Sequence, residues 1–332
     1  MKKNYSQLFE KFKEIAKVKT KAEVIEELGI SDRTYYYWRK KANISIDEAP
    51  KKPRNISKLI EHHKENFSFK EKSDYYYDNI PVTLPNEPCG FLLLGDPHLD
   101  NEGTDLEKFE KDIKVAKETD GVYAVGLGDY IDNWVGYLSK LYAKSSITEE
   151  DAYDLIKYYF SDIAWLALVV GNHDLFNNGL VYFLRQTVGD NVPLSEFIRL
   201  NVKFEGVEDS VTVHLRHQFN GKSQYNPAFS LVKQAIFNMP DDILAQGHTH
   251  QSGYTVWANP HKYLSHCLVV GSYKKVDSFG KKVSLFNQNH FPSVLVVINP
   301  ALPKTNHDRI KVFFDIEQGA KYLEFLRGTK AS

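Results

Sequence analysis

Aspartate, asparagine and histidine recur in five short motifs, and each motif directly follows an apolar run. Such polar side chains are costly to bury unless something pairs with them. The residues with ligand or proton-transfer chemistry are Asp96 and His98 in GDPH, Asp129 and Asp132 in GDYID, Asn172 and His173 in GNHD, His217 in RHQ, and His248 and His250 in GHTH. Their repetition in the same context predicts one shared site.

The chemistry of this set is that of a metal centre. It combines imidazole nitrogens, carboxylates and one amide oxygen without a thiolate, a mixture that suits Mn, Fe, Zn, Co or Ni. Even seven of these nine residues are too many ligands for one ion, but they fit two ions that share a bridging carboxylate, about 3.5 to 4 Å apart. Any one motif alone has an ordinary structural explanation, and we expect His214 and His266 to be structural histidines. Five motifs in order, each after a strand, favour a functional site.

The apolar runs before the motifs are typical of buried strands. They occupy 91–95, 122–128, 163–170, 210–217 and 242–248, with further runs at 264–271 and 292–299, and helical stretches alternate with them. Continuous apolar strands are covered on both faces, and the alternation predicts α/β layering. Because strand carboxyl ends face a common crevice in open α/β sheets, the motifs can converge. A glycine precedes four of them and lets the backbone approach the site closely.

The first 45 residues predict a small all-α domain. A helix over 5–18 and a second helix after Thr20 precede the run LGISDRTYYYWRKKA, in which Gly29 supplies a turn and Ser31 or Asp32 an N-cap for a third helix. The apolar positions expected between the helices are Val24, Leu28, Ile30, Tyr35 and Trp38. This spacing predicts a helix-turn-helix over 1–45.

The outer face of the third helix is basic and aromatic. Its residues are Arg33, Tyr36, Arg39, Lys40 and Lys41. A face of this kind can enter a groove of nucleic acid, and we expect DNA as the partner. The alternative is a three-helix module that binds protein. Residues 46–88 are rich in proline and mixed charges and are interpreted as a linker, and the catalytic domain is expected over 89–332.

Composition and charge set limits on the class of protein. Hydrophobic residues at 42% and charged residues at 26% of 332 residues fit a globular chain. Residues 1–72 hold 18 Lys and Arg against 11 Asp and Glu, a formal charge of +7, and the remainder carries -8. A basic segment usually meets polyanions, although a solvated surface is the plain alternative. Cys89 and Cys267 are interpreted as small buried hydrophobes. No stretch is long and apolar enough to suggest a membrane span or an export signal, so a cytoplasmic protein is expected.

The ordered motifs GDPH, GDYID, GNHD, RHQ and GHTH resemble those of the calcineurin-like metallophosphoesterase superfamily over about residues 90–300. The resemblance implies a four-layer α/β/β/α sandwich with two mixed sheets. It implies that one metal takes Asp96, His98, Asp129 and His250, and that the other takes Asp129, Asn172, His217 and His248. Asp129 then bridges the two ions, with Mn²⁺ expected first and Fe, Zn, Ni or Co as alternatives.

The same resemblance implies the roles of two further residues. His173 would be the general acid that protonates the leaving oxygen, and Asp132 would orient its imidazole. Two cations lower the pKa of a shared water, so that hydroxide exists at neutral pH, and they neutralise the phosphate oxygens during in-line attack. An imidazole can then donate a proton to the departing oxygen.

The motifs differ from those of the phosphoprotein phosphatases at two positions, so the resemblance to that branch of the superfamily is weaker. Asn133 follows GDYID where those enzymes have a phosphate-clamping arginine, and Asp174 ends the third motif where they have glutamate. GNHD is more similar to the DNA-repair nuclease branch and to several cyclic-nucleotide and nucleotide phosphodiesterases. The segments RHQFNGKSQYNPAF and YKKVDSFG are similar to metallophosphoesterases of phage and prophage origin.

Three hypotheses follow from the sequence. The first is a metal-dependent phosphodiesterase or nuclease that acts on DNA and is recruited by residues 1–45. The acidic catalytic domain argues against it, since a nuclease normally has positive potential along its groove. The second is a hydrolase of a small nucleotide or phosphomonoester, and the third is a DNA-binding regulator whose phosphoesterase domain is degenerate. The sequence leaves open the substrate, native metal, cleavage polarity, DNA sequence preference and oligomeric state.

Overall fold

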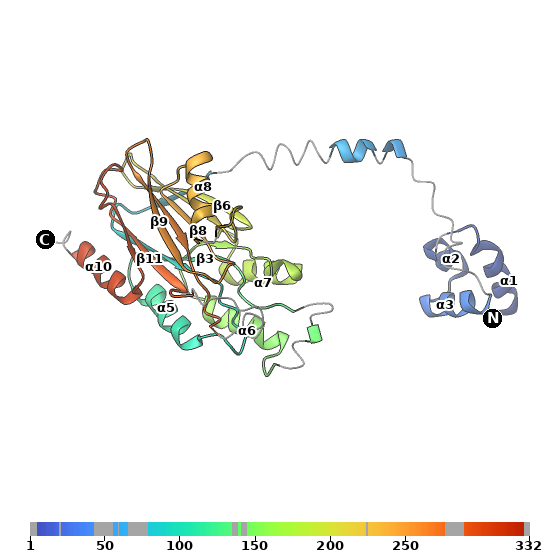
Figure 1. Cartoon of the computed structure of the whole chain (residues 1–332). Helices are drawn as coiled ribbons and strands as arrows, with labels where there is room; N and C mark the ends of the chain where they lie inside the picture. The colour runs from blue at the N-terminus through green and yellow to red at the C-terminus, as the bar shows by residue number, and fades with distance from the viewer. Residues whose placement is uncertain are drawn as a thin grey trace. The chain divides into compact units, whose positions relative to one another are not determined.

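The structure is a computed structural model that describes residues 5–19, 21–42, 56–58, 60–65, 79–134, 139–140, 145–223, 225–275 and 289–328. The chain divides into two compact units, Met1–Tyr76 and Tyr77–Ser332 (Figure 1). Each unit has its own hydrophobic core, so each is described by itself.

The described residues between 5 and 42 of the N-terminal unit form the three predicted helices. They are α1 (Tyr5–Ile15), α2 (Lys21–Leu28) and α3 (Asp32–Lys41). Gly29 has a φ of +57° between α2 and α3, and the side chain of Ser31 accepts a hydrogen bond from the backbone N–H of Thr34 as the N-cap. The buried core is Phe12, Ala16, Val24, Leu28, Tyr35 and Trp38, with Ile30 partly buried beside it. The predicted inward positions are therefore confirmed.

The described residues of the second unit form two six-stranded mixed sheets. One sheet has the order β1-β6-β7-β8-β10-β9, with β1 (Asn79–Leu84), β6 (Phe197–Phe204), β7 (Val211–Arg216), β8 (Ile243–Gln246), β10 (Leu264–Val269) and β9 (Gly253–Ala258). The other has the order β12-β11-β2-β3-β4-β5, with β12 (Ile310–Phe313), β11 (Ser293–Ile298), β2 (Cys89–Leu94), β3 (Val122–Gly126), β4 (Trp165–Val169) and β5 (Leu194–Ser195). Parallel pairing joins β2 to β3 and β3 to β4 in one sheet, and it joins β7 to β8 and β8 to β10 in the other. Within each sheet, the carboxyl ends of these strands therefore lie at the same edge.

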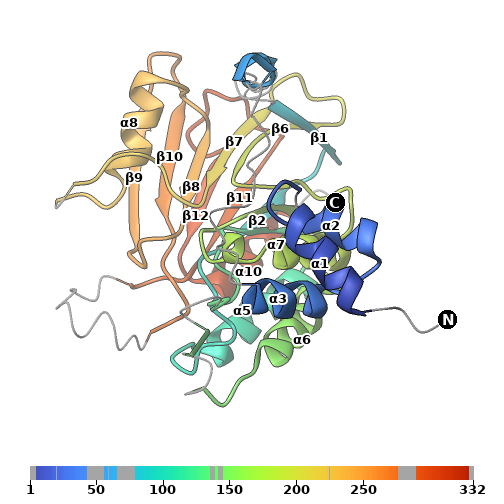
Figure 2. The ribbon, with the colours of Figure 1, turned by 90° about the vertical axis from the view of Figure 1, so that its right-hand side faces the viewer.

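Helices cover the outer faces of both sheets, which gives four layers (Figures 1 and 2). The helices are α5 (Leu106–Glu118), α6 (Glu149–Phe160), α7 (Asn178–Val188) and α10 (Ile316–Gly328) on the β2 sheet, and α8 (Phe229–Phe237) on the β8 sheet. Alternate residues of a strand point to opposite faces. Phe91 and Leu93 accordingly pack between the sheets, whereas Leu92 and Leu94 pack under the helices. Continuous apolar runs are explained by this double burial, and the predicted four-layer architecture is confirmed.

The predicted linker over 46–88 extends too far. Strand β1 lies within it and pairs in parallel with β6 from Asn79 opposite Arg199 to Leu84 opposite Phe204. Its alternation of exposed and partly buried residues suits an edge strand, where Pro81 can lack an N–H without breaking an inner ladder. Residues 56–58 and 60–65 are helical, and residues 43–55, 59 and 66–78 lie outside the described part of the chain.

The two cysteines and the lengths of the helices bear on two further expectations. Cys89 and Cys267 are free and buried, as predicted. Among the described helices, none combines the length and apolar character that crossing a membrane requires.

Candidate metal centre and basic helix

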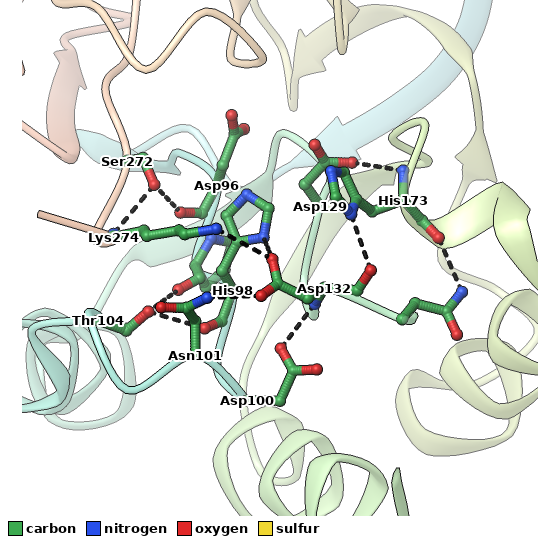
Figure 3. Close-up of polar contacts among 12 residues, drawn as sticks. Asp96, His98, Asp100, Asn101, Thr104, Asp129, Asp132, His173, Ser272 and Lys274 are labelled. Carbon is green, nitrogen blue, oxygen red and sulfur yellow. Dashed lines mark hydrogen bonds and ion pairs between the residues drawn. The ribbon is translucent and has the colours of Figure 1, made fainter. Parts of the chain in front are cut away.

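All five motifs lie in loops that follow strands β2, β3, β4, β7 and β8, and their side chains converge. Figure 3 shows this for the first three motifs, with Asp96, His98, Asp129, Asp132 and His173 labelled. Among the described residues, three sets have ligand atoms that lie within 4.8 Å of one another: Asp96 with His98 and His250, His98 with Asp132 and His173, and Asp129 with His217 and His248. Residues that are far apart in the sequence therefore form one site, as the strand-end pattern predicts.

The first set lies between the loops after β2 and β8. The Nε2 atoms of His98 and His250 are 3.2 Å apart, and His250 Nε2 is 3.5 Å from Asp96 Oδ2. Asp96 is fully buried, and neither of its carboxylate oxygens meets a hydrogen-bond donor at bonding geometry among the described residues. Burial raises the pKa of Asp96 to about 7, and the Asp129 carboxylate also raises it. A buried carboxylate in this state is stabilised by a cation.

The set of Asp129, His217 and His248 adjoins the side-chain amide oxygen of Asn172. Asn172 Oδ1 is 3.1 Å from His217 Nε2 and 2.9 Å from His248 Nδ1, and these two nitrogens are 3.1 Å apart. Asp129 Oδ2 lies 3.1 Å from the same His217 nitrogen. Burial lowers the pKa of His217, but the carboxylates of Asp129 and Asp96 outweigh it and raise this pKa to about 10. A cation that binds here would displace the His217 proton.

These donors fit divalent metal ions. Carboxylate, amide oxygen and imidazole nitrogen face common points, and no thiolate takes part. Burial lowers the pKa of His250 to about 3, with further lowering from His98 and Lys274, and burial also lowers the pKa of His248. Both imidazoles are therefore neutral near pH 7, which is the form that binds a metal. The set around Asp96 does not include Asp129, so the bridging role remains a prediction.

The backbone at the site has strained φ angles, and two carboxylates approach it closely. His98, Asp129, His248 and His250 have φ angles of +44°, +52°, +65° and +50°, a left-handed region that costs non-glycine residues about 1–3 kcal/mol each. Two glycines make room for the carboxylates. A Cβ added at Gly171 would lie 2.2 Å from Asp129 Oδ1, and one at Gly247 would lie 2.2 Å from Asp96 Oδ1.

Asp132 differs from its predicted role. Its backbone carbonyl oxygen, not its carboxylate, accepts a hydrogen bond from His173 Nδ1 at 2.8 Å. The carboxylate instead lies 2.7 Å from His98 Nδ1, accepts a hydrogen bond from Asn101 Nδ2 at 2.6 Å and pairs with Lys274 Nζ at 3.3 Å (Figure 3). It therefore orients a candidate metal ligand, because a carboxylate on one ring nitrogen fixes which nitrogen faces the metal.

The Asp132→Asn variant tests this reassigned role. The affinity for Mn²⁺, measured by calorimetry, should fall roughly 10–100-fold, as is typical when the outer partner of a histidine ligand is lost. The matched control is Asp105→Asn at the N-cap of α5, a position where asparagine also caps well. Unchanged Mn²⁺ affinity in Asp132→Asn would show that the carboxylate does not support His98.

Asp174 supports the loops of the site, although the sequence analysis used it only to compare branches of the superfamily. Its buried carboxylate accepts backbone hydrogen bonds from Asp129 at 2.9 Å, Tyr130 at 3.0 Å and Gly171 at 2.7 Å. It thereby ties the loop after β3 to the loop after β4. The sequence signal for Asp174 was its place at the end of GNHD. Asn101 and Lys274, which contact the Asp132 carboxylate, belong to none of the five motifs and had no such signal.

Residues 90–291 match the family model of the calcineurin-like phosphoesterases. The chain belongs to this family. The match spans the loops that carry all the candidate ligands, from Asp96 to His250. Calcineurin-like phosphoesterases use divalent metals, in agreement with the clustered donors.

Comparisons with other proteins add three similar structures. Vacuolar Protein Sorting 29 from Cryptosporidium parvum has 17% identity and a TM-score of 0.33, over 68% of this chain and 96% of that one. A predicted phosphoesterase from Streptococcus pneumoniae has 13% identity and a TM-score of 0.29, over 68% and 97%. The calcineurin-like phosphoesterase YfkN from Bacillus subtilis has 10% identity and a TM-score of 0.33, over 73% and 100%. No curated protein sequence matches the chain. The family assignment rests on residues 90–291.

The predicted nucleic-acid residues lie on or beside α3. Arg39, Lys40 and Lys41 form its last turn, and Tyr36 is 56% exposed. Lys21 Nζ lies 4.6 Å from the centre of the Tyr36 ring, so α2 adds a cation to the same face. The side chain of Arg33 lies outside what the structure describes, as do residue 224 and residues 276–280 of the two phage-like segments.

Proposed function

We propose that this calcineurin-like phosphoesterase is a phosphodiesterase that cleaves DNA with two divalent metal ions. The supporting observation is the pair of adjoining donor sets beside His173, in a chain that also carries a separate basic helical unit. One ion would be held by Asp96, His98, Asp129 and His250, and the other by Asp129, Asn172, His217 and His248. When bound, such ions supply Lewis acidity that activates water and neutralises phosphate charge.

His173 is the proposed general acid. Its Nδ1 donates to the carbonyl oxygen of Asp132, and a carbonyl only accepts, so Nδ1 carries hydrogen and Nε2 is the atom that exchanges a proton with the leaving oxygen. Its backbone N–H donates to Asp129 Oδ1 at 2.9 Å, which ties the acid to a metal ligand. His98 contacts its ring at a centroid distance of 5.0 Å. The acid is thereby held at the edge of the proposed metal site.

A hydrolase of small nucleotides or phosphomonoesters is the second candidate. The charge of -8 beyond residue 72 favours it, because an acidic surface repels a long polyanion. The degenerate regulator is disfavoured, since each of the seven proposed ligands is a residue type that binds metal.

Metal-supplemented activity separates these candidates. Bis-p-nitrophenyl phosphate and p-nitrophenyl phosphate should be assayed with Mn²⁺, together with single-stranded DNA, duplex DNA, RNA, cyclic dinucleotides and nucleotides. A nuclease should favour the diester and cleave DNA. Preference for monoesters would support the second candidate, and no turnover with any metal would support the regulator.

Deletion of residues 1–45 should weaken DNA binding and leave turnover of bis-p-nitrophenyl phosphate nearly intact. Phosphate contacts by Arg39, Lys40 and Lys41 make affinity fall steeply with salt, so truncation should flatten the plot of log affinity against log salt concentration. The deleted residues include the described core of the N-terminal unit, and the described core clusters of the second unit contain none of them.

A matched pair of variants controls for charge alone. Lys40→Ala with Lys41→Ala removes two lysines from α3, and Lys114→Ala with Lys117→Ala removes two exposed lysines from α5. The salt slope should fall by about 1.8 for the first pair if both lysines contact phosphates, and it should change little for the second. Equal slopes for full-length and truncated protein would assign the N-terminal unit to a protein partner instead.

A further inference from the structure

Two aromatic rings contact the proposed general acid. The ring of Trp134 meets His173 edge-on at a centroid distance of 5.4 Å, and the ring of Phe176 lies tilted at 4.9 Å. Trp134 comes two residues after Asp132, and Phe176 comes two residues after Asp174, so both lie in the loops that build the site. The two rings thus lie one contact beyond His173.

Phe176 does more than pack against the imidazole, because much of its ring remains open. It is 41% exposed, and the neighbouring Leu175 is 42% exposed. Adjacent large apolar side chains beside a polar site mark a surface that a ligand covers. Lys274 Nζ lies 5.9 Å from the centre of the Trp134 ring and also pairs with Asp132, which places a cation between the ring and the donor cluster.

We propose that Trp134 and Phe176 form a binding site for the nucleobase of the leaving nucleoside. This inference rests on the proposed phosphoesterase function and specifies its substrate class. His173 delivers a proton to the oxygen of the leaving sugar, and the base of that sugar then reaches the adjoining rings. Stacking of a base on an aromatic side chain tolerates any sequence and strengthens binding roughly 5- to 150-fold per base. A sugar phosphate or a phosphopeptide without a ring would not gain from it.

The test compares two substrates with the same leaving alkoxide. One is a dinucleoside monophosphate, and the other is its counterpart in which both bases are absent. With Mn²⁺, the wild-type enzyme should favour the base-bearing substrate by roughly tenfold or more in kcat/KM, mainly through KM. Phe176→Ala and Trp134→Leu should bring this ratio toward one. Phe325→Ala makes the same substitution at an exposed ring on α10, outside the five motifs, and should leave the ratio unchanged.

Each outcome separates the base site from the phosphoesterase function. A loss that Phe176→Ala imposes equally on both substrates would show that the ring serves only to pack His173, which would overturn the inference. Turnover of bis-p-nitrophenyl phosphate without preference for the base-bearing dinucleotide would also overturn it and would leave the phosphoesterase intact. Failure of every substrate with every metal would instead overturn the proposed function.

Discussion

Asp129→Asn is expected to abolish metal-dependent turnover and to leave the fold in place. The proposed bridge needs a full negative charge on two oxygens, and an amide offers one weaker oxygen. The loss should exceed the roughly 100-fold that removal of a ligand's outer partner can cost. The amide oxygen can still accept the backbone N–H of His173, as Asp129 Oδ1 does at 2.9 Å, and asparagine tolerates the left-handed backbone, so folding should persist.

Metal content and thermal unfolding give the readout for this variant. Elemental analysis should find less bound metal, and the rise in Tm that Mn²⁺ gives the wild-type protein should shrink, because a ligand stabilises only the state that binds it. Asp162→Asn is the control, since Asp162 also has a left-handed backbone, with φ +62°, at an exposed turn after α6. Two bound ions and a near-normal rate in Asp129→Asn would refute the bridge.

His173→Ala is expected to retain metal and to lose rate by about 10²- to 10⁴-fold, as is typical for loss of one general acid. The imidazole is not among the proposed ligands, and His98 keeps its Asp132 partner when His173 is removed. The loss should depend on the leaving group. An activated p-nitrophenolate departs without a proton, so its hydrolysis should suffer less than that of a dinucleotide, whose alkoxide needs one.

A series of phosphodiesters with leaving groups of increasing pKa measures this dependence. The slope of log rate against leaving-group pKa should be steeper for His173→Ala than for the wild-type enzyme. His261→Ala, which removes an exposed histidine after β9, should leave both rate and slope unchanged. Parallel slopes with a uniform loss would assign His173 to phosphate binding.

The sequence predicted the parts of the site that follow from strand geometry. Motifs after parallel strands must converge, and the structure brings Asp96 together with His250 across 154 positions of the chain. It did not predict contacts that depend on how loops pack. Lys274 reaches Asp132 over a separation of 142 residues, and no spacing rule connects them. The carboxylate of Asp132 could not be assigned to His98 rather than His173, because both imidazoles lie within its reach.

Strand β1 was not predicted, because its local signals opposed the tertiary structure. Strand β1 carries Pro81 in a proline-bearing stretch, which is typical of a linker, yet pairing with β6 orders it. Strand β6 alternates partly buried and buried residues over FIRLNVKF and was recognisable in principle from its period of two.

The left-handed backbone at His98, Asp129, His248 and His250 sets a condition on transplanting this centre into another protein. Copying the side chains onto the strand ends of a relaxed α/β scaffold would aim them differently, because each residue there would adopt an ordinary negative φ. A graft would have to import the whole loops, with Gly171 and Gly247 to admit the carboxylates. A designer should therefore treat the backbone turns, and not the ligand identities, as the unit to be moved.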